Sequence, residues 1–368
     1  MKTIMQDIAK LAGVSPGTVS NALNDRKGVG KETKLKIIKI AEDLGYFHNR
    51  KKNEEKVIRL ILFKKHGYVV SSDTQFFSAL IEACENECRQ RGYELLISQV
   101  IHGEHDKEDV FKIIDQNKID GILLLATEMN ENDFANFENI DIPIVVLDSY
   151  FRTKSYDYIL INNVSGSYGA TKYFIDNGHT RIGFLGSSKN INNFEYRYRG
   201  FIKAINDFKL SFREENKILV EPTLDGAYRD MKNFLLHYKG DLPTALFALN
   251  DIIALGAIKA MQEQGIKIPE QVSIIGFDDI PFSSLSNPNM TTIKVYTNEM
   301  GRLAVKRLIE KIENEDEVSL KIEIDTKLIE RNSVIKLISK IWSTIINSVN
   351  VAIKFQVALN NLRFDIIN

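Results

Sequence analysis

The sequence predicts an α/β protein in which an N-terminal three-helix unit precedes a larger region with two parallel-sheet lobes. Near the N-terminus, two short amphipathic segments meet at a glycine, and a third segment follows. From residue 57 onward, apolar strand-like runs alternate with helical patterns almost to the end of the chain. Such alternation forms parallel sheets covered by helices on both faces, and a region of this length divides into two lobes.

The first predicted helix begins near Thr3, a candidate N-cap. Gln6, three positions later, can return a hydrogen bond to the backbone of the cap. The apolar residues at helical spacing are Ile8, Ala9, Leu11 and Ala12. Gly13 permits the left-handed backbone that ends a helix, so the turn is placed there.

The second predicted helix follows at once. Ser15 is a suitable N-cap, and Pro16 suits the first helical position because its missing amide needs no partner there. The inward side chains are Val19, Ala22 and Leu23, whereas Pro16, Gly17, Thr18, Ser20 and Asn21 point outward. A third helix, residues 31–44, closes the core with Leu35, Ile38, Ala41 and Leu44. This is a helix-turn-helix, whose second helix enters the DNA major groove.

Charge favours this interpretation over plain helix packing, which is the commoner role of a helical hairpin. Residues 1–56 hold 12 basic and 7 acidic side chains, a net charge of +5, and the remainder holds 36 and 42, a net charge of −6. Neutralising DNA phosphates requires the basic end.

Residues 3–49 resemble the DNA-binding headpiece of the lactose and galactose repressor (LacI/GalR) family. The resemblance lies in Ala-Gly-Val-Ser-Pro-Gly-Thr-Val-Ser at residues 12–20, in Thr33 and in Leu-Gly-Tyr at residues 44–46, and it extends over about residues 3–333. It implies a homodimer that binds the two halves of a near-palindromic operator in double-stranded DNA. It also implies control by a small-molecule effector, and repression is the commoner outcome in this family.

The resemblance implies two sets of DNA contacts. The base-facing positions are Met5, Gln6, Pro16, Gly17 and Asn21, and the phosphate-facing positions are Ser15, Thr18, Ser20, Asn24 and Thr33. Thr18 and Ser20 are equally well explained as ordinary hydroxyls on a helix surface. Asn49 and Arg50, at the start of the linker, complete the predicted DNA-binding set.

The linker, residues 48–56, departs from the family. His48 replaces a proline, and Glu55 stands about where the family has a leucine that wedges into the minor groove. A carboxylate does not intercalate beside phosphates. We therefore expect a charged linker that contacts the DNA backbone through Arg50, Lys51 and Lys52.

The alternation beyond the linker defines the remaining elements. Predicted strands span residues 57–63, 94–100, 121–126, 144–147, 158–162, 182–186, 245–248 and 273–277. Predicted helices include residues 76–91, 106–116, 166–177, 195–208, 228–238 and 252–264.

The resemblance implies two lobes like those of periplasmic sugar-binding proteins, with three chain crossings. We place these near Asn162, residues 289–294 and residues 318–321. The predicted domains are a headpiece (1–47), the linker (48–56), an effector-binding and dimerisation region (57–333) and an atypical tail (334–368). Within the third, lobe 1 comprises residues 57–161 and 294–318, and lobe 2 comprises 163–290 and 321–333.

Ligands of parallel sheets bind at the carboxyl ends of the strands. The candidate effector-binding residues there are Phe76, Phe77, Asp148, Arg197, Asn250 and Asp278. The two phenylalanines are as well explained by core packing, and Asp251 is expected to cap the following helix. Arg197 matches the family's effector-binding arginine by its spacing to Gly200 and the aromatic residue after it.

This residue set suits a polyol, because its amide, guanidinium and carboxylate groups pair with hydroxyls and its aromatic faces cover C–H groups. It does not suit a phosphate-rich ligand. A sugar or sugar derivative is therefore the expected effector, although a purine-binding member of the family would have the same scaffold.

Catalysis finds little support in the sequence. It contains 6 His and 2 Cys and has no Gly-x-Ser-x-Gly, P-loop or zinc spacing, so we expect no enzyme activity, cofactor or metal. His102 and His105 are expected in a solvated turn, Cys84 and Cys88 as reduced core thiols, and His179 in a structural role.

The chain is expected to be cytoplasmic and free of membrane contacts, because a capped helix stands where an export signal would begin. Two alternatives remain open. A secreted sugar-binding protein would share the lobes, and a sugar-modifying enzyme would need an acid and base pair around the cleft.

The tail, residues 334–368, has apolar residues at roughly heptad spacing. These are Ile338, Ile341, Ile345, Ala352, Phe355, Leu359 and Leu362. A helix that joins dimers into tetramers and an unstructured, adventitious extension are equally good interpretations.

Asn21 stands where the family often has arginine, and an amide favours adenine over guanine. We predict that Asn21→Ala flattens the base preference at one base pair in each operator half-site, a loss of about 1 to 3 kcal/mol of discrimination. Binding to a set of single-base operator variants measures this. An unchanged preference at every position contradicts the assignment.

Overall fold

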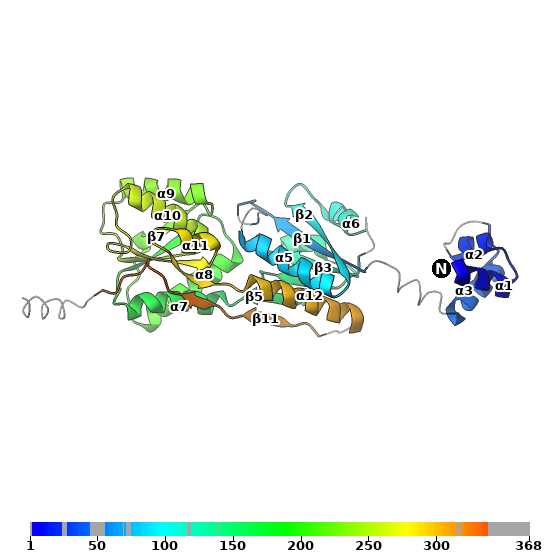
Figure 1. The fold of residues 1–368 in the computed structure, drawn as a ribbon. Coiled ribbons are helices and arrows are strands. Elements are labelled where there is room, and N and C mark those ends of the chain that lie inside the picture. Colours follow the sequence, from blue (N-terminus) through cyan, green and yellow to red (C-terminus); the bar gives the residue numbers. More distant parts are fainter. Residues whose placement is uncertain are drawn as a thin grey trace, which may run out of the picture. The chain divides into compact units, whose positions relative to one another are not determined.

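A computed structural model describes residues 2–23, 28–44, 56–68, 70, 75–115, 119–138, 140–314 and 318–337. The chain divides into two compact units, residues 1–56 and 57–368, which are treated separately below (Figure 1). Asn24, Asn49, Arg50, the rest of the predicted linker up to Glu55 and tail residues 338–368 lie outside the described residues.

The N-terminal unit is a bundle of three helices: α1 (Lys2–Ala12), α2 (Pro16–Leu23) and α3 (Lys31–Asp43). Its core is formed by Ile8, Ala9, Ala12, Val19, Ala22, Ile37 and Ala41. Gly13 has a φ of 73°, and Ser15 Oγ accepts a hydrogen bond from the backbone N–H of Thr18 at 3.1 Å. The predicted glycine turn and serine cap are thus confirmed.

Four details of the predicted bundle are wrong. Helix α1 already includes Thr3, so the predicted start of the helix at a Thr3 cap is wrong. The predicted core residues Leu11, Leu35 and Leu44 are 60%, 69% and 38% exposed. Each residue advances a helix by about 100°, so the buried stripe of α3 through Ile37 and Ala41 turns Leu35 away from the core.

The first lobe contains a six-stranded sheet in the order β11-β5-β4-β3-β1-β2. Its strands are β1 (Lys56–Lys64), β2 (Tyr93–Ile101), β3 (Gly121–Leu125), β4 (Ile144–Leu147), β5 (Asp157–Ile161) and β11 (Lys321–Ile324). Its helices are α5 (Gln75–Gln90), α6 (Lys107–Asp115), the 3-10 helix η1 (Asp133–Phe137) and α12 (Thr297–Asn314). The pairs β1–β3, β3–β4, β4–β5 and β5–β11 are parallel.

Both faces of this sheet are buried, because β3, β4 and β5 are apolar at nearly every position. On one face, Leu60, Leu123 and Val145 belong to the same core cluster as residues of α5 and α12. On the other face, Ile122 and Val146 pack in a second cluster with residues of α6 and η1. The buried sheet brings its strand ends to one edge, where the second lobe meets it.

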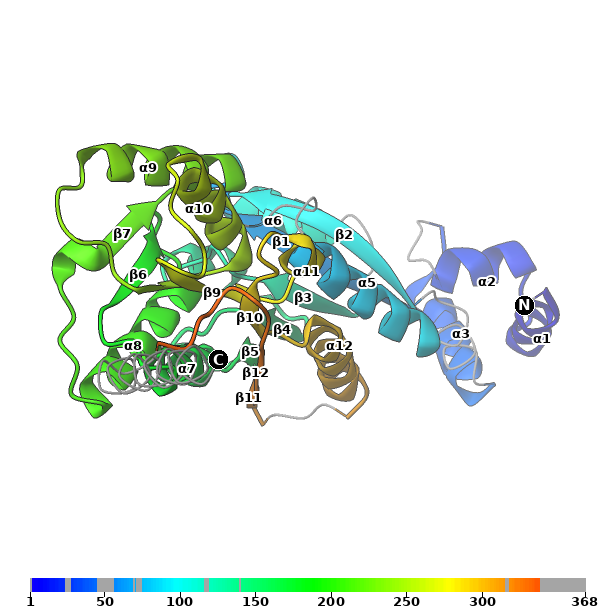
Figure 2. The same ribbon diagram turned by 60° about the vertical axis from the view of Figure 1, so that its left-hand side comes forward.

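The second lobe also contains a six-stranded sheet, in the order β12-β10-β9-β8-β6-β7 (Figure 2). Its strands are β6 (Ile182–Ser187), β7 (Lys217–Val220), β8 (Ala245–Ala248), β9 (Ser273–Asp278), β10 (Thr291–Lys294) and β12 (Lys327–Ile329). Its helices are α7 (Asn163–Asp176), α8 (Asn192–Asp207), the 3-10 helix η2 (Glu214–Asn216), α9 (Leu224–His237), α10 (Asp251–Glu263) and α11 (Pro281–Leu285). Only the pairing of β12 with β10 is antiparallel among its described pairs.

The predicted α/β fold with two parallel-sheet lobes is confirmed. Each predicted strand and helix of the lobes is present, and most ends agree within two residues. The sequence patterns did not predict β7, β10, β11, β12, α11 or α12. All four of these strands have only three or four residues, too few to establish an alternation.

The third predicted crossing is wrong. Strand β11 pairs with β5 in the first lobe, and β12 pairs with β10 in the second, so the chain crosses between Ile324 and Lys327 and not at residues 318–321. The first crossing lies at Asn162, between β5 and α7, and the second follows Lys294. Asn162 Nδ2 donates to Asp325 Oδ1 at 2.8 Å, which joins the first and third crossings.

The two cysteines are buried and unpaired, as predicted. Burial raises the pKa of Cys84, and it raises that of Cys88 to about 12. His179 is buried between Thr244 Oγ1 at 3.1 Å and the Ile335 carbonyl at 3.0 Å, and burial lowers its pKa. Its predicted structural role is therefore confirmed.

His102 is half exposed, with Nδ1 at 3.2 Å from Asp133 Oδ1, and His105 Nδ1 accepts from the backbone N–H of Ile101. Within the described ranges, no cluster of three or more His, Cys, Asp or Glu is arranged to hold a metal ion. No helix in the described part of the chain has the length and apolarity needed to cross a membrane.

A buried ion pair fixes α12 against the first lobe. Asp157 on β5 lies 2.7 Å from Arg307 Nε and 2.8 Å from Lys311 Nζ, and it also accepts from the backbone N–H of Leu320 at 2.8 Å. Asp157 and Arg307 are both at most 6% exposed.

We predict that Asp157→Ala lowers the free energy of unfolding by about 3 to 5 kcal/mol, because the buried Arg307 guanidinium loses the carboxylate at 2.7 Å and is left, among the described carboxylates, with the more distant Glu310 at 3.6 Å. Urea unfolding of the full chain measures this. The control is Asp207→Ala, which removes an exposed partner of Lys203 and should cost less than about 1 kcal/mol. Equal losses in the two variants contradict the assigned importance of Asp157.

Candidate functional site between the lobes

A cavity of about 370 Å³, here called the first cavity, lies between the two lobes. Its lining includes all six predicted effector-binding residues: Phe76, Phe77, Asp148, Arg197, Asn250 and Asp278. The other lining residues are Gly67, Tyr68, Gln75, Thr127, Ile191, Asn193, Phe194, Pro222, Thr223, Leu224, Ile252, Ile280 and Phe282. The structure thus brings the predicted set together, and contact with a ligand stays a prediction.

Two of these carboxylates stand at strand ends in unusual backbone conformations. Asp148 follows β4 with a φ of 64°, and Asp278 ends β9 with a φ of 117°. Positive φ values are uncommon for residues other than glycine, and such strain gathers at functional sites. The backbone conformation therefore supports a binding role for these strand ends.

Asp148 is buried, and both of its oxygens already have partners. Thr127 Oγ1 donates to Oδ2 at 2.6 Å, and Asn193 Nδ2 donates to Oδ1 at 2.8 Å. Burial raises the pKa of Asp148, although these two hydrogen bonds and Arg197 oppose the shift. Since Asn193 belongs to lobe 2, this contact joins the lobes.

Arg197 on α8 is almost fully buried by neutral and charged partners. Its guanidinium stacks on the Phe277 ring, 3.8 Å from the ring centre. Nε donates to Asn163 Oδ1 at 2.8 Å, Nη1 to the Leu249 carbonyl at 2.6 Å and Nη2 to Asp278 Oδ1 at 3.2 Å. The arginine is therefore held in position before any ligand binds.

Asn163 and Asn193, which the sequence did not single out, complete a continuous chain of hydrogen bonds. The chain runs Asp148–Asn193–Asn163–Arg197–Asp278, and the contact between the two asparagines measures 3.0 Å. We call it the interlobe chain. The sequence contained a signal for Asn193, because this residue precedes Arg197 by four positions and therefore lies on the same face of the helix.

Asp278 has a single donor in the described part of the chain, Arg197. The pKa of Asp278 is raised to about 7, chiefly by burial and also by the neighbouring Asp251 and Asp148, against the effect of Arg197. Two carboxylates and one guanidinium thus line the first cavity. This balance favours a ligand that donates hydrogen bonds over an anion.

The predicted capping role of Asp251 is wrong. Asn250 caps α10, since its Oδ1 accepts from the backbone N–H of Ile253 at 2.9 Å. Asp251 lies inside the helix and accepts from Ile280 N, Ser283 Oγ and Thr292 Oγ1 at 2.9, 2.6 and 2.5 Å. It therefore fixes α11 and β10 beside the cavity, and burial raises its pKa to about 6.

Phe76 and Phe77 both pack against the core and both line the first cavity. Phe77 is 4% exposed and packs in the core, whereas Phe76 is partly buried beside it, and the two rings meet edge to face at 5.0 Å. Both rings line the first cavity, so Phe76 offers the more accessible aromatic surface.

A carboxylate also organises the loop that enters the cavity. Glu128 accepts hydrogen bonds from the backbone N–H groups of Lys65, His66, Gly67 and Val70, at 2.7 to 3.1 Å. This loop carries Tyr68, whose ring lies 5.0 Å from Lys189 Nζ of lobe 2. Tyr68 was missed because no sequence pattern marks a loop residue of this kind.

The candidate DNA-binding residues lie on the separate N-terminal unit. Gln6, Ser15, Pro16 and Gly17 are exposed, and Met5, Thr18, Ser20, Asn21 and Thr33 are partly buried. Ser15 Oγ also lies 2.9 Å from Thr18 Oγ1. These two hydroxyls are therefore engaged with each other in the absence of DNA.

We predict that Asp278→Asn flattens the pH dependence of stability. An unfolded Asp has a pKa near 3.9, so a folded pKa of about 7 contributes stability below about pH 4 that is lost as pH rises through 7. The wild-type chain should lose at most about 1.4 kcal/mol per pH unit from this group. Unfolding midpoints between pH 5 and 7.5 measure the slope. The exposed Asp225→Asn variant should keep it, and an unchanged slope in Asp278→Asn refutes the prediction.

Two family models match the chain. Residues 4–49 match the model described as bacterial regulatory proteins, lacI family, and residues 171–334 match the periplasmic binding protein-like domain. The first match includes the predicted helix-turn-helix, and the second falls mainly in the second lobe.

Curated relatives match over nearly their whole length. The HTH-type transcriptional repressor PurR of Pasteurella multocida is 34% identical over 344 residues, which cover 91% of this chain and 99% of that protein. PurR of Haemophilus influenzae is 33% identical over 350 residues, with coverage of 91% and 99%. These names agree with the prediction of a regulator.

Solved structures share the fold at lower identity. A complex of the transcriptional regulator CelR with cellobiose has a TM-score of 0.68 at 22% identity and covers 89% of this chain and 99% of that one. The lac repressor dimer bound to operator and the anti-inducer ONPF has a TM-score of 0.67 at 22% identity, with coverage of 89% and 98%. A LacI family regulator from Enterococcus faecium with bound ribose has a TM-score of 0.66 at 23% identity, with coverage of 77% and 100%.

The full-length relatives, the N-terminal family match and the two-lobed fold agree with the resemblance found in the sequence. The chain therefore belongs to the LacI family of bacterial regulatory proteins, and it is a DNA-binding transcriptional regulator with a helix-turn-helix headpiece and a two-lobed effector-binding domain.

Proposed function

We propose that the chain is a cytoplasmic repressor that binds a near-palindromic operator as a homodimer and responds to a small neutral ligand in the first cavity. The interlobe chain carries this proposal, because it joins both lobes through the cavity. A ligand that pairs with Arg197 or Asp278 competes with bonds inside this chain. The names of the curated relatives support repression over activation.

The first two turns of α8 carry both the residues that contact lobe 1 and the arginine that we assign to the ligand. Asn192 Nδ2 donates to Ser149 Oγ of lobe 1 at 2.9 Å, next to the Asn193–Asp148 contact. Arg197, one turn further along the same helix, contacts Asp278 of lobe 2. A ligand held by Arg197 therefore changes the contacts that fix the lobes. Effector and operator affinities are then coupled in both directions.

A carbohydrate is the ligand class we favour. Asn250 Nδ2 and Asp278 Oδ2 have no partner among the described residues, so they offer a donor and an acceptor to hydroxyl groups. Phe76 adds an aromatic surface for the C–H side of a sugar ring. The structures of CelR and of the Enterococcus faecium regulator, named with cellobiose and ribose, support this class.

A purine base is the second candidate. Apolar side chains such as Phe194, Ile252 and Phe282 form most of the cavity wall, which suits a flat aromatic ring. The N–H groups of such a ring can donate to Asp278. An anionic ligand is disfavoured for either class, because two carboxylates already face one guanidinium.

On the headpiece, we assign base contacts to the exposed N-terminal part of α2 and to Gln6 of α1. Gly17 supports close approach to DNA, since a Cβ at this position would meet only Ser15 Oγ, at 3.6 Å. Asn21 follows one turn later on α2, and Thr33 on α3 is assigned to a phosphate.

One experiment tests effector control. Sugars and nucleobases are screened by thermal shift on the full chain, and operator binding is repeated with each hit. We expect a hit to change operator affinity by about fivefold or more. Arg197→Met should abolish the thermal shift because it removes the guanidinium beside Asp278, whereas the exposed Arg199→Met on the same helix should keep it.

Arg197→Lys provides a second test if the methionine variant is unstable, since it keeps the charge but not the three directed contacts. A ligand that binds without any change in operator affinity overturns effector control. A full thermal shift in Arg197→Met overturns the proposed site.

A further inference from the structure

A second cavity of about 370 Å³ adjoins the first. Gln75, Phe76, Asp278 and Ile280 line both cavities, so these four side chains form a shared wall. Of the residues predicted from the sequence to bind the effector, Phe76 and Asp278 line this second space, whereas the rest of its wall, nine residues from Asp279 to Glu299 together with Gln75 and Ala79, was not predicted. Its position extends the candidate site toward the second crossing between the lobes.

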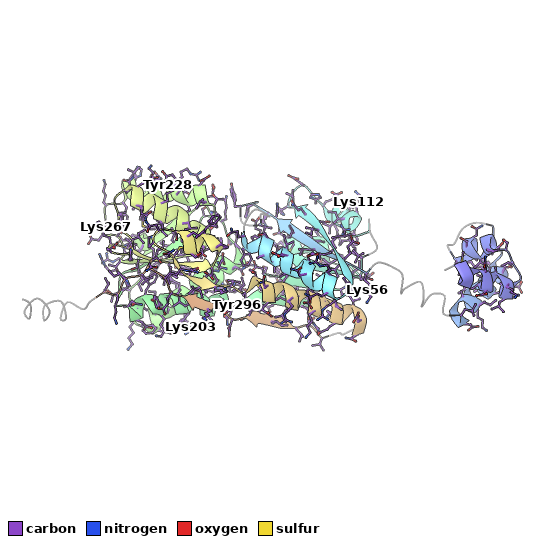
Figure 3. All side chains as sticks on the ribbon, in the orientation of Figure 1. Lys56, Lys112, Lys203, Tyr228, Lys267 and Tyr296 are labelled. Atoms are coloured by element: carbon purple, nitrogen blue, oxygen red, sulfur yellow. The ribbon has the colours of Figure 1, made fainter. Side chains whose placement is uncertain are left out.

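The second cavity lies where the chain passes from β10 to α12. Lys294 ends β10, and Tyr296, Thr297, Asn298 and Glu299 follow as the chain enters α12. Figure 3 shows Tyr296 beside the start of α12. Opposite this segment, Ala79 of α5 belongs to the lining of the second cavity and not of the first.

Two acceptor oxygens of the shared wall have no donor in the described part of the chain. Gln75 Oε1 is buried without a hydrogen bond, and Asp278 uses only Oδ1, toward Arg197. Asp278 Oδ2 is not among the buried unpaired atoms, so it can accept from a hydroxyl or N–H group of a ligand, and a turn of the Gln75 amide into the cavity would give its Oε1 a partner as well.

The two cavities differ in chemistry. The first is lined mainly by apolar and aromatic side chains, whereas the second presents hydroxyl, amide and charged groups from Tyr296, Thr297, Asn298 and Lys294. Three carboxylates, those of Asp278, Asp279 and Glu299, line the second cavity with one cationic side chain, Lys294. Each carboxylate also pairs with an arginine outside that lining, namely Arg197, Arg331 and Arg302, and Lys294 itself pairs with Asp279, so no cation among the described lining residues is free to bind an anion. A phosphate or carboxylate is therefore disfavoured there, and a hydroxylated neutral group is favoured.

We propose that the two cavities form one binding site, and that its ligand has two linked units. A ring occupies the first cavity, and a hydroxylated sugar unit passes the shared wall at Gln75 and Asp278 into the second cavity. This inference rests on the proposed effector site. A disaccharide and a nucleoside both have this chemistry, and the experiment separates them.

Such a ligand contacts the chain crossing itself. A single ring in the first cavity reaches the strand ends and the interlobe chain, whereas the second unit also meets residues 294–299. Two-unit ligands should therefore bind more tightly and should act more strongly on operator affinity than their one-unit counterparts.

Matched probes test the proposal by calorimetry with the full chain. Glucose is compared with cellobiose, and adenine with adenosine. In one pair, we expect the two-unit member to bind at least about tenfold tighter, as one or two hydrogen bonds to Gln75 and Asp278 would provide. The pair that shows no such gain in affinity identifies the ligand class that does not fit the site.

Two substitutions on α5 locate the second unit. Ala79→Leu places a larger side chain in the second cavity and should remove the tenfold advantage while one-unit binding persists. The exposed Glu82→Leu on the same helix is the matched control and should keep the advantage. Gln75→Met, which removes the amide at the shared wall, should reduce the advantage several-fold. Unfolding midpoints without ligand verify that each variant folds.

The outcomes separate this inference from the proposed function. If one-unit probes bind as tightly as two-unit probes, or if Ala79→Leu leaves the advantage intact, the second cavity is not part of the site and effector control still stands. If no probe of either class binds, the proposed effector classes fail and the two-unit ligand fails with them.

Discussion

The two-lobed region depends on how buried carboxylates are satisfied between its sheets. Asp148 of lobe 1 and Asp278 of lobe 2 lie at strand ends, and Arg197 contacts Asp278 directly and Asp148 through two asparagines. The neutral side-chain amides of Asn163 and Asn193 link Asp148 to Arg197, where a second cation would otherwise be needed. Asp278 keeps Arg197 as its one donor among the described residues, and burial raises its pKa, so its second oxygen remains available as an acceptor.

Much of the fold and of the first cavity was predictable, because apolar strands alternate with helices and parallel sheets gather their strand ends at one edge. That rule identified Asp148, Asn250 and Asp278 from sequence alone. Asn163 and Gln75 were missed since their importance arises only when the crossings and α5 meet in three dimensions. The third crossing was misplaced because strand pairing in three dimensions determines it. The exposure of Leu35 was missed because the rotation of α3 about its axis determines which side chains face the core.

The spacing between Arg197 and Gly200 shows why a sequence motif can predict the position of a side chain in a cavity. A Cβ at Gly200 would lie 2.3 Å from the Val164 carbonyl and 2.0 Å from Ser167 Oγ, so only glycine lets α8 pack this closely on α7. This approach places Arg197 within reach of Asn163, the first residue of α7. The glycine three positions after the arginine therefore sets the position of the guanidinium, although it touches no part of the cavity itself.

The loop held by Glu128 bears on the thermodynamics of recognition. Four backbone N–H groups, those of Lys65, His66, Gly67 and Val70, are anchored on one carboxylate, so the conformational entropy of these residues is lost when the lobe folds. Tyr68 is thereby carried on an anchored loop at the wall of the first cavity. A molecule that binds beside it would bear less of the ordering cost that mobile loops impose, because that cost is already met in folding.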